Sequence, residues 1–336
     1  MVNTRVLFPD SIYRLAVKRG GIVKTSEVYR IGIDSHRVSR LITQGILSKP
    51  GRGLLVIKEA ALQSLNDVGE PQYLRLRAAY SPVLAAGPSA AAAGQAAIVL
   101  MGAQGLPKTI IPEFTTKSGG PTALDHIYHN RREPFTQARQ INGVNFVLPE
   151  VALAQAVTGL PRNNAIALMD SMLNNNLLDP TGLARAENLT ARRVNAKNVR
   201  PWWRLVDQRS QSPAETFARL TCLDLGCPAD ALQLEVFDAF GSQVARVDMG
   251  WRLPDGRWLL GEIDGFDFHS TARQLQADRS RQNQLMSSNT ILRRWNGADA
   301  MRGRLASDVH RILQDARWRP GQVPKPEAAR MWLAAR

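Results

Sequence analysis

The sequence has few of the residues that are typical of a secreted protein, a membrane-spanning protein or a zinc-binding module. Its 336 residues include two cysteines, Cys222 and Cys227, and no further cysteine or paired-histidine motif that would complete a zinc module. No apolar run reaches the roughly 18–20 residues of a membrane helix, and Met1 to Asp10 lacks the charged-then-apolar order of a signal peptide. We therefore expect a soluble, cytoplasmic protein whose thiols are reduced packing residues.

Acidic residues are also scarce relative to basic ones. The chain has 43 Lys and Arg against 29 Asp and Glu, a formal net charge of +14, and 6% aromatic residues. This charge predicts a polyanionic partner, although charge alone does not separate DNA from RNA or anionic lipid. Counted by segment, residues 1–58, 180–210 and 270–336 carry +8, +5 and +8, whereas residues 211–269 carry −6. Basic flanks around an acidic island are typical of sites that hold a metal ion against phosphate, and a functionless uneven surface is the alternative.

Residues 11–58 show the pattern of a winged helix-turn-helix. Apolar spacing and capping residues predict three helices, followed by two strands that a Pro-Gly turn joins. These elements are Ser11 to Arg19, Thr25 or Ser26 to Arg30, Asp34 or Ser35 to Ile42, Ile46 to Lys49 and Gly53 to Ile57, with Pro50-Gly51-Arg52 as the turn. The third helix of such a domain enters the major groove of DNA while the wing reaches phosphate.

The outward polar residues of this segment are the candidates for contact with duplex DNA. They are Ser35, Arg37 and Arg40 on the third helix, and Lys49 and Arg52 on the wing. Residues 20–28 (GGIVKTSEV), 33–41 (IDSHRVSRL) and 45–56 (GILSKPGRGLLV) resemble the N-terminal domain of AbiEi-type antitoxins. That resemblance implies DNA binding, repression of the protein's own promoter and a cognate toxin partner, and a protein-docking winged helix is the alternative.

The middle of the chain carries no chemical motif. Residues 59–180 are almost neutral and predict a helical connecting domain, in which the small residues 90–94 permit close helix approach. Residues 181–211 predict a basic linker, with Trp202 and Trp203 either stacking on bases or pinning the linker to a domain. Residues 321–336 predict a flexible tail.

The strongest chemical signal lies between residues 212 and 264. Ser212 as cap and Pro213 as first residue predict a helix that carries Glu215, and three strands follow over 232–237, 243–253 and 257–264. The turn Pro254-Asp255-Gly256 makes the last two strands a hairpin. If Leu253 faces Arg257, Asp248 faces Glu262, and Asp264 shares their face. Facing carboxylates repel, so the pattern predicts a divalent cation, Mg²⁺ or Mn²⁺, held by Asp248 and Glu262; a solvated acidic face is the alternative.

The same segment is similar to the PD-(D/E)XK restriction-endonuclease fold, and closest to its very-short-patch-repair branch. The residues that carry the similarity are 212–215 (SPAE), 246–248 (RVD), 261–269 (GEIDGFDFH), 278–281 (DRSR) and 291–295 (ILRRW). It implies a mixed sheet flanked by helices, with Asp278 to Ser287 as a crossover helix and Thr290 to Trp295 as the next strand. It also implies assisting roles for Glu215 and Asp264, a role for His269 as general acid or base, and contact of Arg279 and Arg281 with the scissile phosphate. The motif lysine is absent, because Asp264 stands in its place.

The sequence therefore predicts a multidomain α+β protein. Its parts are a winged helix (1–58), a helical connecting domain (59–180), a basic linker (181–211), a nuclease-like domain (212–320) and a tail (321–336). The predicted function is a Mg²⁺-dependent endonuclease that the winged helix delivers to duplex DNA. The alternative is a non-catalytic antitoxin and transcriptional repressor of a type IV (abortive infection) toxin–antitoxin system, which the missing lysine favours. No membrane partner is expected, and the sequence leaves the oligomeric state open.

Overall fold

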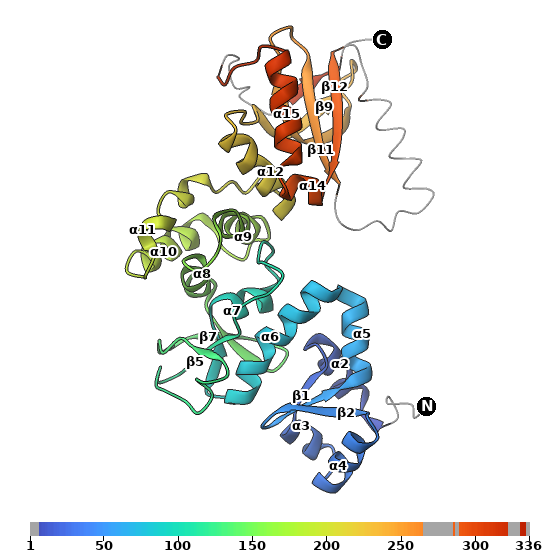
Figure 1. Cartoon of the computed structure of the whole chain (residues 1–336), viewed down its shortest axis with the longest axis vertical. Coiled ribbons are helices and arrows are strands. Elements are labelled where there is room, and N and C mark those ends of the chain that lie inside the picture. The colour runs from blue at the N-terminus through green and yellow to red at the C-terminus, as the bar shows by residue number, and fades with distance from the viewer. Residues whose placement is uncertain (1–6, 265–284, 286–288, 322–329, 334–336) are drawn as a thin grey trace. The chain divides into compact units, whose positions relative to one another are not determined.

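The computed structural model describes residues 7–264, 285, 289–321 and 330–333 (Figure 1). By internal contacts it divides into two compact units, unit 1 (Met1–Ala165 and Asn175–Arg204) and unit 2 (Ile166–Asn174 and Leu205–Arg336). Three candidate site residues, His269, Arg279 and Arg281, lie outside the described residues, as does most of the predicted crossover helix. Within the described part, no helix combines the length and the apolar character that crossing a bilayer requires.

Unit 1 begins with the predicted three helices and hairpin. The helices are α2 (Asp10–Lys18), α3 (Thr25–Arg30) and α4 (Ser35–Thr43), and the hairpin strands are β2 (Leu47–Gly51) and β3 (Leu54–Ile57). A short strand that the sequence analysis missed, β1 (Ile22–Lys24), pairs antiparallel with β3 and gives the sheet order β1-β3-β2. This is the arrangement of a winged helix-turn-helix, and the predicted elements are confirmed. The turn is displaced, because Pro50 and Gly51 belong to β2 and Gly53, at φ 76°, takes the left-handed conformation that ends the turn.

Capping and burial fix the third helix, α4. Asp34, rather than Ser35, is its N-cap, and the Asp34 carboxylate accepts a hydrogen bond of 2.8 Å from the backbone N–H of Arg37. Val38 and Leu41 are buried in a core that the other elements of the winged helix complete. Helix α4 therefore presents its opposite, polar face outward.

The winged helix and the region after it belong to the same unit, and a buried arginine joins them. Arg19, with 1% of its surface exposed, donates from Nε and Nη2 to the backbone oxygen of Asn142 at 2.9 and 2.6 Å. Its Nη1 pairs with Glu27 at 2.9 Å, so the guanidinium is neutralised inside the unit.

The region over residues 59–180 contains a five-stranded sheet, so the prediction of a helical connecting domain is wrong in part. The sheet order is β6-β5-β4-β8-β7. The strands are β4 (Ala90–Ala92), β5 (Glu113–Thr116), β6 (His129–Asn130), β7 (Ala138–Ile141) and β8 (Val144–Val147). The alanine-rich segment, which we expected to be helical, is the buried central strand, because methyl side chains fit where the helices of this region approach the sheet. None of these strands exceeds four residues, too short for alternation to be recognised.

Helices precede and follow these strands along the chain and continue through the segment that we predicted to be a linker. They are α5 (Lys58–Val68), α6 (Glu70–Ala86), α7 (Gly94–Met101), α8 (Pro149–Val157), α9 (Arg162–Asn174), α10 (Pro180–Thr190), α11 (Ala196–Val199) and the 3-10 helix η1 (Trp202–Leu205). Helices α6 and α7 pack against the sheet, and most of α9 belongs to unit 2. The linker prediction for 181–211 is wrong, because α10 packs against α8 and Trp203 is 8% exposed. Burial of Trp203 makes it an anchor rather than a platform for bases.

Unit 2 contains a mixed five-stranded sheet, and three helices cover one of its faces (Figure 1). Its elements are α12 (Pro213–Asp224), β9 (Ala231–Phe237), β10 (Gln243–Arg252), β11 (Trp258–Asp264), β12 (Thr290–Asn296), α14 (Gly297–Met301), α15 (Arg304–Asp315) and β13 (Arg330–Trp332). The order is β12-β11-β10-β9-β13, in which β9, β10 and β11 are antiparallel and β12 and β13 are parallel to their neighbours.

The predicted register of the hairpin is confirmed. Leu253 donates its N–H to the oxygen of Arg257 at 2.7 Å, and the ladder runs from Arg252–Trp258 to Met249–Gly261. The flexible-tail prediction is wrong for β13, which adds an edge strand beside β9. There the Trp332 ring stacks on Phe237 with centroids 5.6 Å apart.

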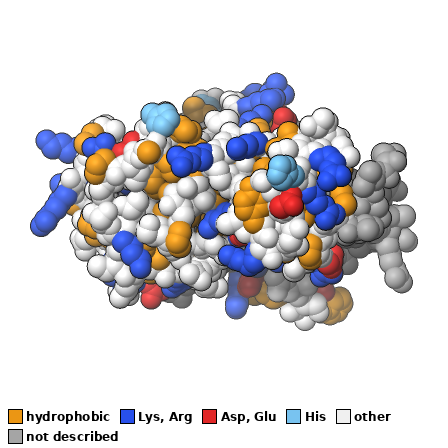
Figure 2. All heavy atoms as spheres, turned by 90° about the horizontal axis from the view of Figure 1, so that it is seen from below, with side chains coloured by type: hydrophobic (Ala, Val, Ile, Leu, Met, Phe, Trp, Pro, Cys, Tyr) orange, Lys and Arg blue, Asp and Glu red, His pale blue; other side chains and the backbone are white. Residues whose placement is uncertain are grey.

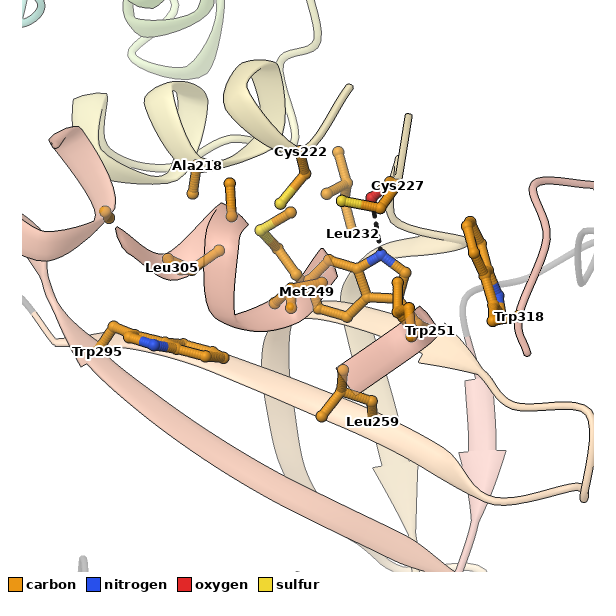
Figure 3. Close-up of a cluster of buried hydrophobic side chains, with 14 of the residues drawn as sticks. Ala218, Cys222, Cys227, Leu232, Met249, Trp251, Leu259, Trp295, Leu305 and Trp318 are labelled. Atoms are coloured by element: carbon orange, nitrogen blue, oxygen red, sulfur yellow. Dashed lines mark hydrogen bonds between the residues drawn. The ribbon is translucent and has the colours of Figure 1, made fainter. Parts of the chain in front are cut away.

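Side chains from α12, α14 and α15 pack with the helix-covered face of the sheet into one apolar core (Figure 3). Cys222 and Cys227 are free and buried in it, which confirms their role as packing residues. The indole N–H of Trp251 donates to the backbone oxygen of Cys227 at 3.0 Å, so this large buried side chain has its polar atom satisfied.

Candidate functional site

The five candidate DNA contacts of the winged helix are all exposed. Helix α4 carries Ser35, Arg37 and Arg40, and the wing carries Lys49 in β2 and Arg52 in the turn. Because Val38 and Leu41 point into the core, Arg37 and Arg40 are held on the outer side of a capped helix. Within the described part of the chain, no ion pair is recorded for these four cations. Their charge is therefore available to a phosphate or a base edge.

Positively charged side chains are also common elsewhere on the surface. On the face drawn in Figure 2, Lys and Arg side chains are spread over the surface, and Asp and Glu side chains are few. Such a surface attracts a polyanion without reading its sequence. Sequence reading would then fall to the few cations on α4.

The acidic residues of unit 2 lie where the ladder of the β10–β11 hairpin ends. The ladder between β10 and β11 ends at Met249–Gly261, one pair before Asp248 and Glu262. The Asp248 carboxylate instead accepts a hydrogen bond of 2.7 Å from the backbone N–H of Ile263. A side chain has thus taken the place of a ladder hydrogen bond, and the strands part at this point.

Glu215 lies near Asp248 but is already well satisfied. Its carboxylate accepts hydrogen bonds from the backbone N–H of Gln211 at 2.8 Å, the Ser212 hydroxyl at 2.8 Å and the Gln233 side-chain amide at 2.9 Å. Burial, followed by the charge of Asp248, raises the pKa of Glu215, and these three hydrogen bonds oppose the rise. Gln233 has a φ of 51° within β9, so the strand is distorted where it holds Glu215.

A cation that we did not single out from the sequence, Arg294, pairs with the other two carboxylates. It stands beside Glu262 in the parallel pairing of β11 with β12. Arg294 Nη2 lies 2.5 Å from Asp264 Oδ1, and Arg294 Nε lies 3.6 Å from Glu262 Oε2. Glu262 is 6% exposed, so its charge needs a partner. Two adjacent arginines in an otherwise apolar strand, ILRRW, were the available sequence signal, but their partner lies about thirty positions earlier in the chain.

All four carboxylates of the predicted metal site already have protein partners in the described part of the chain. Glu262 and Asp264 share Arg294, and the Glu215 carboxylate accepts three hydrogen bonds. Among the residues that the structure describes, no three His, Cys, Asp or Glu side chains form a group that could hold a metal ion. The Arg294 guanidinium thus lies beside two of the carboxylates to which we assigned Mg²⁺ or Mn²⁺, and the metal site stays a prediction.

Removal of this guanidinium tests its role. Arg294→Ala should lower the free energy of unfolding of unit 2 by about 2 kcal/mol, because the buried Glu262 carboxylate loses its partner. It should also allow millimolar Mn²⁺ to raise the Tm of the variant by more than that of the parent, since the freed carboxylates then bind a cation. The measurement is Tm with and without Mn²⁺, with the exposed neighbour Arg293→Ala as control. Equal stability of the two variants would show that Arg294 does not neutralise the cluster.

Comparison with known proteins bears on the N-terminal part. Residues 10–58 match the family described as "Transcriptional regulator, AbiEi antitoxin". Two Mycobacterium tuberculosis proteins, uncharacterized protein MT2308 (strain CDC 1551 / Oshkosh) and uncharacterized protein Rv2248 (strain ATCC 25618 / H37Rv), are each 27% identical over 187 residues. The match covers 53% of this chain and 65% of each relative. No solved structure matches the chain.

The family match confirms the resemblance of the N-terminal segment to AbiEi antitoxins. It coincides with the winged helix, because residues 10–58 run from the start of α2 to the residue after β3. The resemblance of residues 212–295 to restriction endonucleases stays a prediction, since none of these matches bears on it.

Proposed function

We propose that this protein is a transcriptional regulator that binds duplex DNA through its winged helix and represses its own promoter. In this proposal the protein is the antitoxin of an abortive-infection system, and its partner is a cognate toxin. The observation that carries the proposal is the set of exposed cations on α4 and the wing, within the segment that matches AbiEi antitoxins. A capped helix with arginines three residues apart on its outer face suits base edges in a major groove, and wing cations suit phosphate.

The test is binding of the full chain to the duplex upstream of its own coding sequence. We expect that duplex to bind at least about a thousandfold more tightly than an unrelated duplex of equal length at the same salt concentration, as specific regulators do. Fluorescence anisotropy of the two labelled duplexes measures this ratio. Equal affinity for both would exclude sequence-specific repression of that promoter, and no binding to either would exclude the DNA-binding role.

A Mg²⁺- or Mn²⁺-dependent endonuclease is the second candidate. The approach of Glu215 to Asp248, and the position of Glu262 and Asp264 at the end of the adjacent strand, favour it. The absence of the motif lysine and the pairing of Asp264 with Arg294 weigh against it. If the protein is a transcriptional regulator, unit 2 is a scaffold. If it is an endonuclease, unit 2 is the catalytic part.

Plasmid DNA separates the two candidates. The regulator predicts that supercoiled plasmid stays intact with Mg²⁺ or Mn²⁺ on an agarose gel, whereas the endonuclease predicts nicked or linear product. Cleavage that EDTA abolishes and that Asp248→Ala removes, while Arg293→Ala does not, would establish the endonuclease and overturn the scaffold role.

A further inference from the structure

A second basic surface lies in unit 1, on the segment from α10 to η1. Four of its cations are exposed: Arg192, Lys197, Arg200 and Arg204. The ion pairs recorded here involve two other arginines, Arg185 with Glu150 at 3.4 Å and Arg193 with Glu133 at 2.7 Å. In the described part of the chain, no ion pair is recorded for the four exposed cations, which we call the 192–204 surface.

This surface is hollowed rather than flat. Two adjoining pockets with volumes of about 440 and 330 Å³ share Ala191, Ala196 and Lys197 in their walls. Arg192 lines the first pocket, and Arg200 lines the second together with Trp203 and one acidic residue, Glu187. Cationic side chains thus border two concave sites with room for phosphate groups.

The backbone that carries these cations is anchored between them. Arg193 donates two parallel hydrogen bonds to the Glu133 carboxylate at 2.7 and 2.8 Å, the geometry that binds a guanidinium most firmly. Asn195, at a left-handed φ of 64°, donates from its side-chain amide to the oxygen of Thr158 at 3.4 Å. Val199 and Trp203 are buried at 1% and 8% exposure. Anchors and exposed cations therefore alternate along the segment, and the cations are held in place before any ligand arrives.

We propose that the 192–204 surface binds the sugar-phosphate backbone of duplex DNA, as a second contact in addition to the winged helix. Exposed, uncompensated arginines bind phosphate as a two-pronged fork, and lysine binds it as a point charge. Trp203 is buried, so the surface offers cations rather than a ring on which bases stack. Contacts of this type add affinity and orientation without reading sequence. The inference rests on the proposed function in one respect, that the polyanion is DNA.

The test compares two triple variants of the full chain that each remove three positive charges from unit 1. The first, Arg192→Ala with Lys197→Ala and Arg200→Ala, removes most of the surface. The second, Lys108→Ala with Lys117→Ala and Arg139→Ala, removes three exposed cations elsewhere and is the matched control. Affinity for the upstream duplex and for an unrelated duplex is measured by anisotropy over a salt series, after Tm values have shown that both variants fold.

We expect the first variant to bind both duplexes more weakly by about the same factor, about tenfold or more, and its salt slope to fall by about 2.7, which is 0.9 for each lost phosphate contact. The control should keep the slope of the parent. If the two variants bind alike, the surface is not a DNA contact, although the proposed function stands as long as the parent binds. If the first variant loses affinity for the upstream duplex alone, its cations read sequence and the backbone role is wrong. A parent that binds neither duplex overturns the proposed function and this surface together.

Discussion

Replacing Arg37 and Arg40 with Ala is expected to weaken binding to the upstream duplex by about 100-fold, which corresponds to about 3 kcal/mol. Both side chains lie on the outer face of α4, where Val38 and Leu41 fix the orientation of the helix. An arginine that binds a base edge or a phosphate there loses its hydrogen bonds and its charge together. The salt slope should also become shallower by about 0.9 for each phosphate contact that is lost.

The effect on sequence preference distinguishes this variant from one altered in the 192–204 surface. Affinity for an unrelated duplex should fall much less than affinity for the upstream duplex, because base contacts contribute to specific binding alone. Lys117→Ala with Arg139→Ala removes the same charge from unit 1 and serves as control. Unchanged affinity and slope in the Arg37/Arg40 variant would mean that α4 does not contact DNA, and a protein-docking winged helix would then be the better interpretation.

Local signals in the sequence were sufficient where a few adjacent residues determine the geometry. Ser212 and Pro213 start α12 as predicted, because a hydroxyl cap and a proline at the first position act within one turn. The turn at Asp255 and Gly256 sets the register of the β10–β11 hairpin, because a short turn leaves one pairing available. The helices of the winged helix were predictable for the same reason.

Contacts between residues distant in the sequence were not predictable in this way. The ion-pair partner of Glu262 and Asp264 is Arg294, which lies on β12, about thirty positions later in the chain. Residues 90–92 form a strand because β5 and β8 pair with them on either side, although the alanine segment has no strand signal of its own. The edge strand β13 forms because the parallel partner β9 is available far earlier in the chain.

The ion pair between Asp170 and Arg219 gives the second large expected effect. Asp170 is 1% exposed, and its carboxylate accepts hydrogen bonds from the Arg219 guanidinium at 2.9 Å, the Thr216 hydroxyl at 2.8 Å and the backbone N–H of Asp207 at 2.7 Å. These contacts tie α9 to α12 within unit 2. Arg219→Ala should therefore lower the free energy of unfolding of unit 2 at neutral pH by about 3–5 kcal/mol, the cost of leaving one member of a buried pair without its partner.

The pH dependence of this loss follows from the pKa of Asp170. Burial raises that pKa from 3.8 to about 6, and Arg219 is the first of the groups that oppose the rise. Because the folded state holds this proton more tightly than the unfolded state, the stability that Asp170 contributes is complete below about pH 4 and is lost as the pH rises through about 6. Without Arg219 the pKa rises further, so the variant loses more stability than the parent over the same interval. The difference between variant and parent should be small at pH 4 and greatest above pH 6.

Urea unfolding across this pH range, followed by tryptophan fluorescence, measures the difference. Five of the seven tryptophans, Trp251, Trp258, Trp295, Trp318 and Trp332, belong to unit 2, so the signal reports mainly on that unit. Arg219→Lys keeps the charge and should recover part of the loss at neutral pH. The matched control is Arg209→Ala, whose side chain is 56% exposed in its pair with Asp207, and it should cost less than about 1 kcal/mol. If Arg219→Ala is as mild as Arg209→Ala, or if its cost does not change with pH, the pair does not stabilise unit 2 as an ionised, buried contact.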